Sequence, residues 1–382
     1  EKTDAVLREI EQVICEEERE PDTEQTLSTE EFASRVERIK EWMDTENLSK
    51  QQRRAVRDVE RKSLPRMKEY ERHIAIMGER NSYAKSDPDA TFMRMKEDAM
   101  LNGQLKPGYN VQIATENQFI TNYGIFQRPA DTGTLIDFLE SFHKKYGLYS
   151  REIVADAGYG SQQNYEYMFE KGMIPYVKYN YFHKEQTRAF RNNPFLQQNL
   201  RYDPSADVFT CPAGKSMVPI CSQNPKSESG YRAHTRLYQA SGCTECPLRK
   251  ECHNAEGNRI IRVNHRLNEY KEKVRELLTS ERGILHRSRR PIEPEAVFGQ
   301  IKADRMFRRF RLRSLEKVNI EFGLVALAHN LRKMAANTPL SGPYNVALSQ
   351  TGRCRSAKYP LTSIPKITAV RYIIGIHNKE AV

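Results

Sequence analysis

The sequence has 382 residues and lacks any apolar run close to the roughly 20 residues that a membrane-spanning helix needs. The start of the chain also lacks the charged, apolar and small-residue succession of a secretory signal peptide. The first residue is Glu1 rather than methionine, so we expect a fragment or a processed product. These absences predict a cytoplasmic protein with no membrane partner.

Positive charge and clustered cysteines are what the sequence does have. The formal net charge is +11 and 38% of the residues are hydrophobic, which predicts a protein that binds a polyanion, with nucleic acid favoured over a membrane surface. Five of the seven cysteines lie between Cys211 and Cys252. This crowding favours a metal cluster in a reducing compartment over a disulfide framework.

Residues 1–78 predict a helical region with little apolar content. Two sets of apolar side chains recur at the spacing of an amphipathic helix: Val6, Ile10 and Val13, and Phe32, Val36 and Ile39. The basic stretch from Lys50 to Arg72 could face DNA, although a solvated face or a helical hairpin is the preferred interpretation.

The middle of the chain predicts a mixed α/β domain in two parts, 79–181 and 265–336. The first part is expected to contain strands at Tyr109–Thr115, Phe119–Phe126, Glu152–Asp156 and Ile174–Lys178, with helices that bury Leu135, Leu139 and Phe142 and that run from Ser161 to Lys171. A cysteine-rich insertion, 182–264, separates the two parts. A long helix at Leu315–Met334 closes the second part, and 337–382 is assigned to a C-terminal tail.

Asp156 stands at the end of an apolar run and before Ala-Gly-Tyr-Gly160. A carboxylate at the end of a buried strand needs a partner, either a metal ion or a basic side chain. The alternative is an aspartate that caps a strand-to-helix turn. A second acidic site, Glu293 and Glu295, lies within the basic segment from Arg282 to Arg313 and favours the first interpretation.

Four thiols have a spacing that suits tetrahedral zinc: Cys211, Cys243, Cys246 and Cys252. Cys221 and His253 are spare candidates. The alternative is a loop whose metal site has decayed. We therefore expect one structural Zn²⁺ in the insertion.

Basic side chains crowd around the second acidic site, and guanidinium groups suit phosphate oxygens. The residues that we expect to contact DNA are Arg287, Arg290, Lys302, Arg308 and Arg309. Phe307 and Phe310 lie among them and are expected in the core rather than stacked on bases.

Several motifs together resemble the DDE transposases of bacterial insertion sequences. The shared motifs are Gly108-Tyr-Asn-Val-Gln112, Asp156-Ala-Gly-Tyr-Gly160 with Asn164, and Glu295 followed seven residues later by Lys302. Arg80–Tyr83, Asp87–Glu97 and Asn102–Lys106 resemble the branch of this family that carries a cysteine-rich insertion. The resemblance spans roughly 80–334.

The resemblance implies an RNase H-like mixed sheet, flanked by helices, in which three carboxylates hold Mg²⁺ or Mn²⁺. Asp156 would be the second acid and Glu295 the third. Glu293 competes with Glu295, but the family spacing to lysine selects Glu295, because seven residues after Glu293 stands Gln300. The Asp-Gly-Thr motif of the first acid is missing, so we expect that acid upstream of Glu1, with Asp87 or Asp89 as poor substitutes.

The expected function is therefore a DNA transposase that hydrolyses phosphodiesters and transfers strands at the ends of an insertion sequence. Its partners would be double-stranded DNA, as terminal inverted repeats and target, and further copies of the chain on that DNA, at the bacterial nucleoid. One alternative is a catalytically incomplete remnant that only binds DNA. Another is a zinc-stabilised interaction module without a nucleic-acid role.

Overall fold

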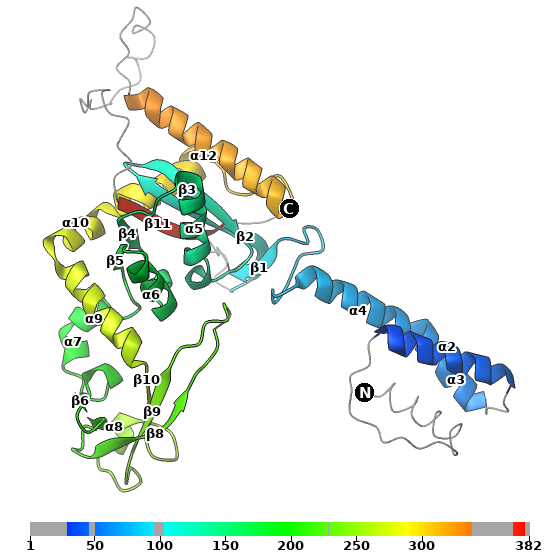
Figure 1. Cartoon of the computed structure of the whole chain (residues 1–382), viewed down its shortest axis with the longest axis horizontal. Helices are drawn as coiled ribbons and strands as arrows, with labels where there is room; N and C mark the ends of the chain where they lie inside the picture. The colour runs from blue at the N-terminus through cyan, green and yellow to red at the C-terminus, as the bar shows by residue number, and fades with distance from the viewer. Residues whose placement is uncertain (1–28, 46–49, 95–102, 228, 338–369, 379–382) are drawn as a thin grey trace, which may run out of the picture. The chain divides into compact units, whose positions relative to one another are not determined.

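The computed structural model describes residues 29–45, 50–94, 103–227, 229–337 and 370–378. Contacts divide the chain into two compact units, Glu1–Tyr83 and Ala84–Val382, which are treated separately below (Figure 1). The expected helix with Val6, Ile10 and Val13 lies outside the described residues.

The first unit is helical, as the sequence predicts. It contains α2 (Thr29–Thr45), α3 (Lys50–Asp58), the π-helical turn η1 (Val59–Ser63) and α4 (Leu64–Met77). Phe32, Val36 and Ile39 are at most 3% exposed and pack on Val56 and Val59, so the predicted apolar face of α2 is confirmed.

The second unit is built on a mixed sheet whose described strands follow the order β1-β2-β11-β4-β5, with β3 also paired to β2. The strands are β1 (Thr91–Arg94), β2 (Leu105–Glu116), β3 (Phe119–Phe126), β4 (Glu152–Ala155), β5 (Ile174–Val177) and β11 (Val370–Asn378). Strand β11 runs antiparallel to β2 and parallel to β4. It comes from the range that the sequence assigned to a tail, and it lies in the middle of the sheet (Figure 1).

Helices cover both faces of this sheet, and the side chains of β2 alternate between the two cores that these helices form with it. Ala114 belongs to a core with α5 (Leu135–Tyr146), α6 (Gln162–Glu170) and α9 (His265–Thr279). Tyr109, Val111 and Ile113 belong to a core with α11 (Ala296–Gly299) and α12 (Leu315–Asn337). This two-residue alternation is the pattern of a strand buried on both faces, and the fold class is mixed α/β.

A helical stretch from Glu281 to Asp304 leads toward α12. It consists of α10 (Glu281–Arg289), the π-helical η6 (Pro291–Glu295), α11 and the π-helical η7 (Gln300–Asp304). In a π-helix each backbone hydrogen bond spans five residues instead of four, and such segments occur often at functional sites. Here η6 contains both acidic residues, Glu293 and Glu295.

The cysteine-bearing region forms a second, antiparallel sheet in which neighbours in space are also neighbours in sequence, β10-β9-β8-β7-β6. Its strands are β6 (Arg201–Asp203), β7 (Val208–Thr210), β8 (Ser216–Gln223), β9 (Thr235–Ala240) and β10 (Ile260–Val263). Short helical turns accompany it: η4 (Lys184–Gln186), α7 (Arg188–Arg191), η5 (Gln197–Asn199) and α8 (Arg249–Cys252). Within the described ranges, no helix is both long and apolar enough to cross a bilayer.

Candidate active site

Asp156 directly follows β4 and begins the 3₁₀ turn η3 (Ala157–Tyr159). Its Oδ1 accepts a hydrogen bond of 2.9 Å from the amide of Ala157, so the aspartate does cap the turn. Gly160 closes this turn against the end of β5, where an added Cβ would stand 2.4 Å from the carbonyl oxygen of Lys178. Only glycine allows that approach. The carboxylate of Asp156 remains 47% exposed and available for further partners.

Arg290 joins Asp156 to Glu295. Its Nη2 lies 3.2 Å from Asp156 Oδ2, and its Nη1 lies 3.3 Å from Glu295 Oε1. The side chain of Arg290 is only 10% exposed, whereas the two carboxylates are 47% and 44% exposed. The structure therefore brings together the two acids that the sequence selected, on either side of one buried cation.

The π-helical turn η6 explains how Arg290 reaches Glu295. The two residues are five positions apart, and side chains at that separation share a face where the backbone hydrogen bonds span five residues. In a regular α-helix the matching separations are three and four. Pro291 and Pro294 both lack an amide hydrogen, which favours a departure from the regular helix here.

Glu293 and Glu295 have different surroundings. Glu293 is 8% exposed. Its Oε2 accepts hydrogen bonds from the amide of Gln118, at 2.8 Å, and from the hydroxyl of Thr115, at 3.3 Å. The hairpin turn between β2 and β3 contains Gln118 with φ of 65°, so Glu293 secures a strained turn. Glu295 is the acid that lies beside Arg290.

Lys178 is a second cation at Asp156 that the sequence did not single out. It follows β5, and its Nζ lies 3.5 Å from Asp156 Oδ1. Partial burial raises the pKa of Asp156, but Arg290, the amide of Ala157 and Lys178 together outweigh burial and leave that pKa lowered. Asp156 is thus ionised at neutral pH. No sequence signal pointed to Lys178, because the parallel pairing that brings the carboxyl ends of β4 and β5 together is seen only in the structure.

The motif residues Asn110, Gln112 and Asn164 support the turns beside Asp156. Asn110 donates to Asp131 Oδ1 at 2.9 Å, and Gln112 donates to the hydroxyl of Thr134. Asn164 donates to the carbonyl of Tyr159 at 2.9 Å. All three side chains are buried. They fix the loop after β3 and the turn η3, and so hold Asp156 in place.

Asp87 and Asp89 accept hydrogen bonds elsewhere, at the start of α12. Asp87 is fully buried, and its carboxylate accepts hydrogen bonds from the hydroxyl of Tyr109 at 2.8 Å and the amide of Ser314 at 3.1 Å. Asp89 accepts from the amide of Leu315 at 2.8 Å. Both acids therefore anchor the start of α12. Strand β11, which runs beside β4, contains no aspartate or glutamate.

Two carboxylates that face one cation form a donor set that suits a divalent ion. Mg²⁺ takes hard oxygen ligands, commonly one or two carboxylates together with phosphate oxygens of the substrate. Asp156 and Glu295 supply such oxygens. In the part of the chain that the structure describes, no group of three His, Cys, Asp or Glu side chains is placed to hold a metal ion.

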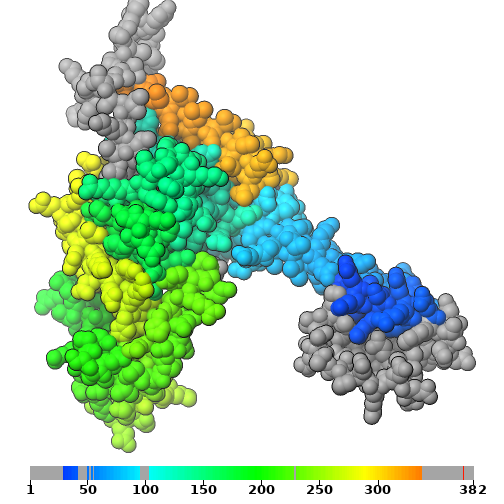
Figure 2. All heavy atoms as spheres, in the orientation of Figure 1, coloured from blue at the N-terminus to red at the C-terminus, as the bar shows by residue number. Residues whose placement is uncertain are grey.

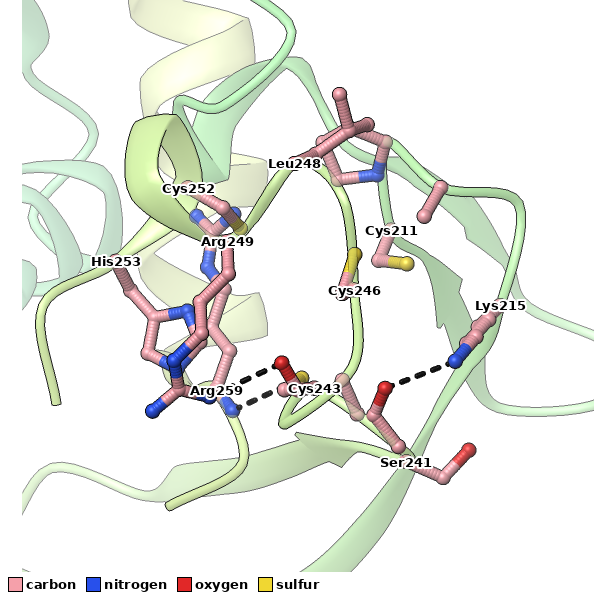
Figure 3. A pocket seen from close by; sticks show the side chains of 14 residues that line it. Cys211, Lys215, Ser241, Cys243, Cys246, Leu248, Arg249, Cys252, His253 and Arg259 are labelled. Atoms are coloured by element: carbon pink, nitrogen blue, oxygen red, sulfur yellow. Dashed lines mark hydrogen bonds between the residues drawn. The ribbon is translucent and has the colours of Figure 1, made fainter. Parts of the chain in front are cut away.

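The four expected zinc ligands line a single pocket in the cysteine-bearing region (Figure 3). Two tight turns present three of them, since the amide of Gly214 donates to the carbonyl of Cys211 at 2.9 Å and the amide of Cys246 to that of Cys243 at 3.4 Å. Cys252 lies at the end of α8. The guanidinium of Arg259 donates to Cys252 Sγ at 3.1 Å. The thiols fit zinc by their chemistry, but the sulfurs do not form a complete ligand set in this arrangement.

The two spare candidates have other positions. Cys221 is exposed on β8 and does not line the pocket. His253 lines it, with Nε2 at 3.0 Å from the carbonyl of Gly257.

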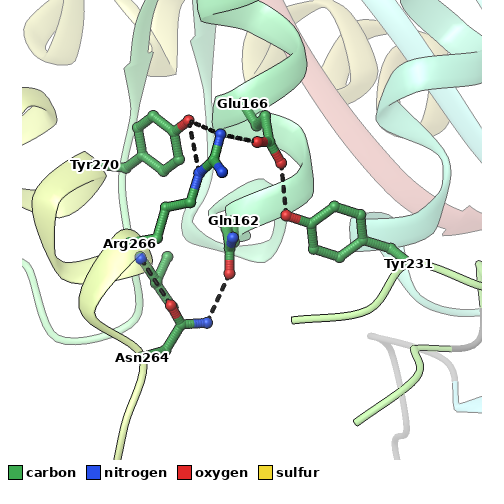
Figure 4. A network of polar contacts seen from close by, with 7 residues as sticks. Gln162, Glu166, Tyr231, Asn264, Arg266 and Tyr270 are labelled. Atoms are coloured by element: carbon green, nitrogen blue, oxygen red, sulfur yellow. Dashed lines mark hydrogen bonds and ion pairs between the residues drawn. The ribbon is translucent and has the colours of Figure 1, made fainter. Parts of the chain in front are cut away.

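A polar network ties the cysteine-bearing region to α6, the helix that follows the Asp156 turn (Figure 4). Glu166 accepts a hydrogen bond of 2.6 Å from Tyr231 and forms an ion pair with Arg266. Asn264 donates to Gln162 at 2.7 Å. Burial, and then the carboxylate of Glu166, raise the pKa of Tyr231, so its hydroxyl stays protonated as a donor. The network positions the insertion relative to the helix beside the acids.

The expected DNA contacts fall into two groups. Arg308 and Arg309 are exposed, and Lys302 is partly exposed in η7. Arg290 is buried between the acids, and the guanidinium carbon of Arg287 lies 5.3 Å from the ring centre of Phe182. Phe310 is 1% exposed and Phe307 packs on the same core, so the prediction that both belong to the core is confirmed.

Comparison with known protein families gives a match to part of the chain. Residues 210–335 match a family model described as a transposase DDE domain. This segment includes Glu295, Arg290 and the four pocket cysteines, and it ends within α12; Asp156 lies outside it. No curated protein and no solved structure matches the chain. This segment, a third of the chain, is therefore similar to the DDE domain of transposases.

Proposed function

We propose that the chain is a transposase that cuts and joins DNA at the ends of an insertion sequence, with Asp156 and Glu295 as two of its metal ligands. The meeting of these two acids at Arg290 carries the proposal. They come from distant segments, only one of which lies in the matched family segment. A bound Mg²⁺ or Mn²⁺ would stabilise the charge that develops at the phosphate during hydrolysis or strand transfer.

Some residues of the proposed site provide charge, and others fix the position of the charged groups. Asp156 and Glu295 provide ionised oxygens, and the Ala157 amide fixes the direction of Asp156. Lys178 and Arg290 offset the repulsion between two carboxylates and a DNA phosphate. Arg308, Arg309 and Lys302 would contact the phosphate backbone, in agreement with the net charge of +11. We expect double-stranded DNA as substrate, in the bacterial nucleoid.

A second function has its own supporting observation. Neither β11 nor any other described segment adds a third acid to Asp156 and Glu295. Arg290 forms ion pairs with both carboxylates, so it occupies the oxygens that a metal ion would need. The described residues therefore also suit a protein that binds DNA ends without cutting them. DNA cleavage separates the two functions, because both predict DNA binding that weakens as salt rises.

The test is metal-dependent nicking of supercoiled plasmid by the purified chain, with Asp156→Asn and Glu295→Gln as variants. We expect each variant to lose at least about 100-fold in rate, because a metal ligand loses its charge, and to bind DNA as before. Glu293→Gln is the matched control. It should cost stability but keep nicking at the level of its folded fraction, since a glutamine oxygen can still accept from Gln118.

The outcomes separate the proposals. Nicking that survives in Asp156→Asn or Glu295→Gln would end the role of that residue. DNA binding without nicking by the unaltered chain, in either Mg²⁺ or Mn²⁺, would select the non-cutting function.

Further details of the proposal concern the cysteine-bearing region. We place the chain in the transposase branch with a cysteine-rich insertion, and we propose one structural Zn²⁺ bound by Cys211, Cys243, Cys246 and Cys252. The shared pocket and the two tight turns support it. Binding would require the Arg259 guanidinium to leave Cys252 Sγ, because a thiolate ligand faces the metal rather than a hydrogen-bond donor.

A further inference from the structure

Helix α12 is apolar on two opposite faces. Its inner face contains Val318, Phe322, Ala326 and His329, all at most 5% exposed, and packs on the core beside β3. Asn330 fixes this face to β3 through both backbone groups of Ile120, at 2.8 and 2.9 Å. A helix held in this way normally presents polar residues to water on its other side.

The outer face presents large apolar side chains instead. They are Ile320, Leu324, Leu327, Leu331 and Met334, with exposed fractions from 54% to 63%. Figure 2 shows part of α12, in orange, at the surface of this unit. We call these five residues the α12 stripe. A contiguous exposed apolar patch of this kind marks an interaction surface.

The spacing within the stripe suits a helical partner. The intervals are four, three, four and three residues, an average of 3.5, which is the period of a coiled-coil seam. A flat surface or an extended peptide would not require that period. The sequence after Asn337 contains Pro339, Pro343, Pro360 and Pro365, and proline is unfavourable inside a helix, so the partner is sought in a second copy of α12.

We propose that the α12 stripe pairs with the α12 stripe of a second copy, in antiparallel orientation. In this arrangement Ile320 faces the partner's Leu331, and Leu324 faces the partner's Leu327. Ala328 beside the stripe is small and exposed, which permits close approach of the helices. Five side chains, each more than half exposed, offer about 500 Å² per copy, or about 1,000 Å² in a pair, the lower limit of a specific interface.

Charge selects the antiparallel orientation. Lys317 continues the line of the stripe, three residues before Ile320, and is exposed. A parallel pair would place the two copies of Lys317 against each other in the seam, which is unfavourable. An antiparallel pair separates them and brings Glu316 of one copy within about one turn of Arg332 of the other. Both of these side chains are exposed.

The test uses the full chain without DNA or metal, so that its result is independent of the cleavage chemistry. Light scattering and sedimentation at about 1 to 100 µM should show a dimer. Leu324→Glu alone and Leu327→Lys alone should each weaken dimerisation at least about 100-fold, because each buries a charge against leucine. Leu148→Glu, at an exposed leucine outside the stripe, is the control and should remain dimeric.

A chain that carries both Leu324→Glu and Leu327→Lys determines the orientation. In an antiparallel pair the glutamate of each copy faces the lysine of the other, so dimerisation should return. In a parallel pair like charges face each other and the double variant stays monomeric, which would overturn the proposed arrangement. A monomeric unaltered chain at about 100 µM, or a dimer unaffected by Leu324→Glu, would overturn the interface itself. Melting curves confirm that each variant is folded.

Discussion

The two sheets of the second unit are assembled in opposite ways. The cysteine-bearing sheet joins strands in the order of the sequence, each antiparallel to the next. The other sheet places β11, from the end of the chain, between β2 and β4. Local pairing needs only short loops, whereas distant pairing must first bring remote segments together. The sheet beside the acids therefore depends on contacts that no local stretch of sequence contains.

The same contrast holds for the chemical groups. The four pocket cysteines come from two nearby turns and a short helix within one region. The acids come from the end of β4 and from η6, and only Arg290 and the packing of the sheet bring them together. Spacing alone pointed to the cysteines as one cluster, whereas the sequence linked the two acids through motifs and the resemblance to a family.

The largest expected effect tests whether the cysteine-bearing sheet, called the local sheet below, needs its thiols in order to stay folded. Replacing Cys243 and Cys246 together by serine should remove the one zinc per chain that we propose and unfold this sheet. Structural zinc sites contribute about 10 kcal/mol or more of binding free energy. Elemental analysis and hydrogen exchange of β7 to β9 measure the two effects. Cys221→Ser, an exposed thiol outside the pocket, is the control. Purified protein without zinc would contradict the prediction.

The next effect tests whether the sheet that contains β2 and β4 needs the remote strand β11 for its stability. Ile373 is fully buried and pairs with Ala114 on one side and Ala155 on the other. Ile373→Ala should lower the free energy of unfolding by about 2–5 kcal/mol, because it leaves a cavity between two strands. Urea unfolding, with hydrogen exchange at β2 and β4, measures this loss.

The matched change in the local sheet is Ile260→Ala, where the isoleucine is 48% exposed. It should cost less than about 1 kcal/mol, since less apolar surface is buried there. Equal losses for the two variants would mean that β11 does not hold the sheet together.

The smallest effect is a pH dependence at another remote contact, between α12 and the β2–β3 turn. His329 Nε2 lies 2.8 Å from the carbonyl of Gln118, and its Nδ1 lies 2.9 Å from the guanidinium of Arg305. Burial lowers the pKa of His329, although the Gln118 carbonyl opposes this effect. The folded state therefore binds fewer protons at this residue than the unfolded chain.

It follows that the stability contributed by neutral His329 is fully present above the unfolded pKa of about 6.5 and is lost as pH falls toward the folded pKa. We expect the melting temperature of His329→Gln to change less than that of the unaltered chain between pH 7.5 and about 5. His234→Gln, at an exposed histidine directly before β9, is the control. Parallel pH profiles for His329→Gln and the unaltered chain would remove His329 as the cause.

The sequence predicted features that depend on neighbouring residues. The period of α2 placed Phe32, Val36 and Ile39 in a core, and the same argument buried Leu135, Leu139 and Phe142. The family spacing to Lys302 selected Glu295 over Glu293; in the structure Glu295 and Asp156 each pair with Arg290, and their role as metal ligands stays a prediction. Amphipathic period and motif spacing are local properties, so one sequence suffices to read them.

Only the tertiary structure decided which distant groups meet. Nothing in the sequence of Val370–Asn378 indicates that it lies between β2 and β4, because its apolar residues suit any buried strand. Nothing near Lys178 or Arg290 in the chain indicates that both cations share Asp156. Ion pairs of this kind form where folding brings charges from remote segments into a partly buried site. Local sequence thus determined the elements and the candidate acids, and long-range packing determined their partners.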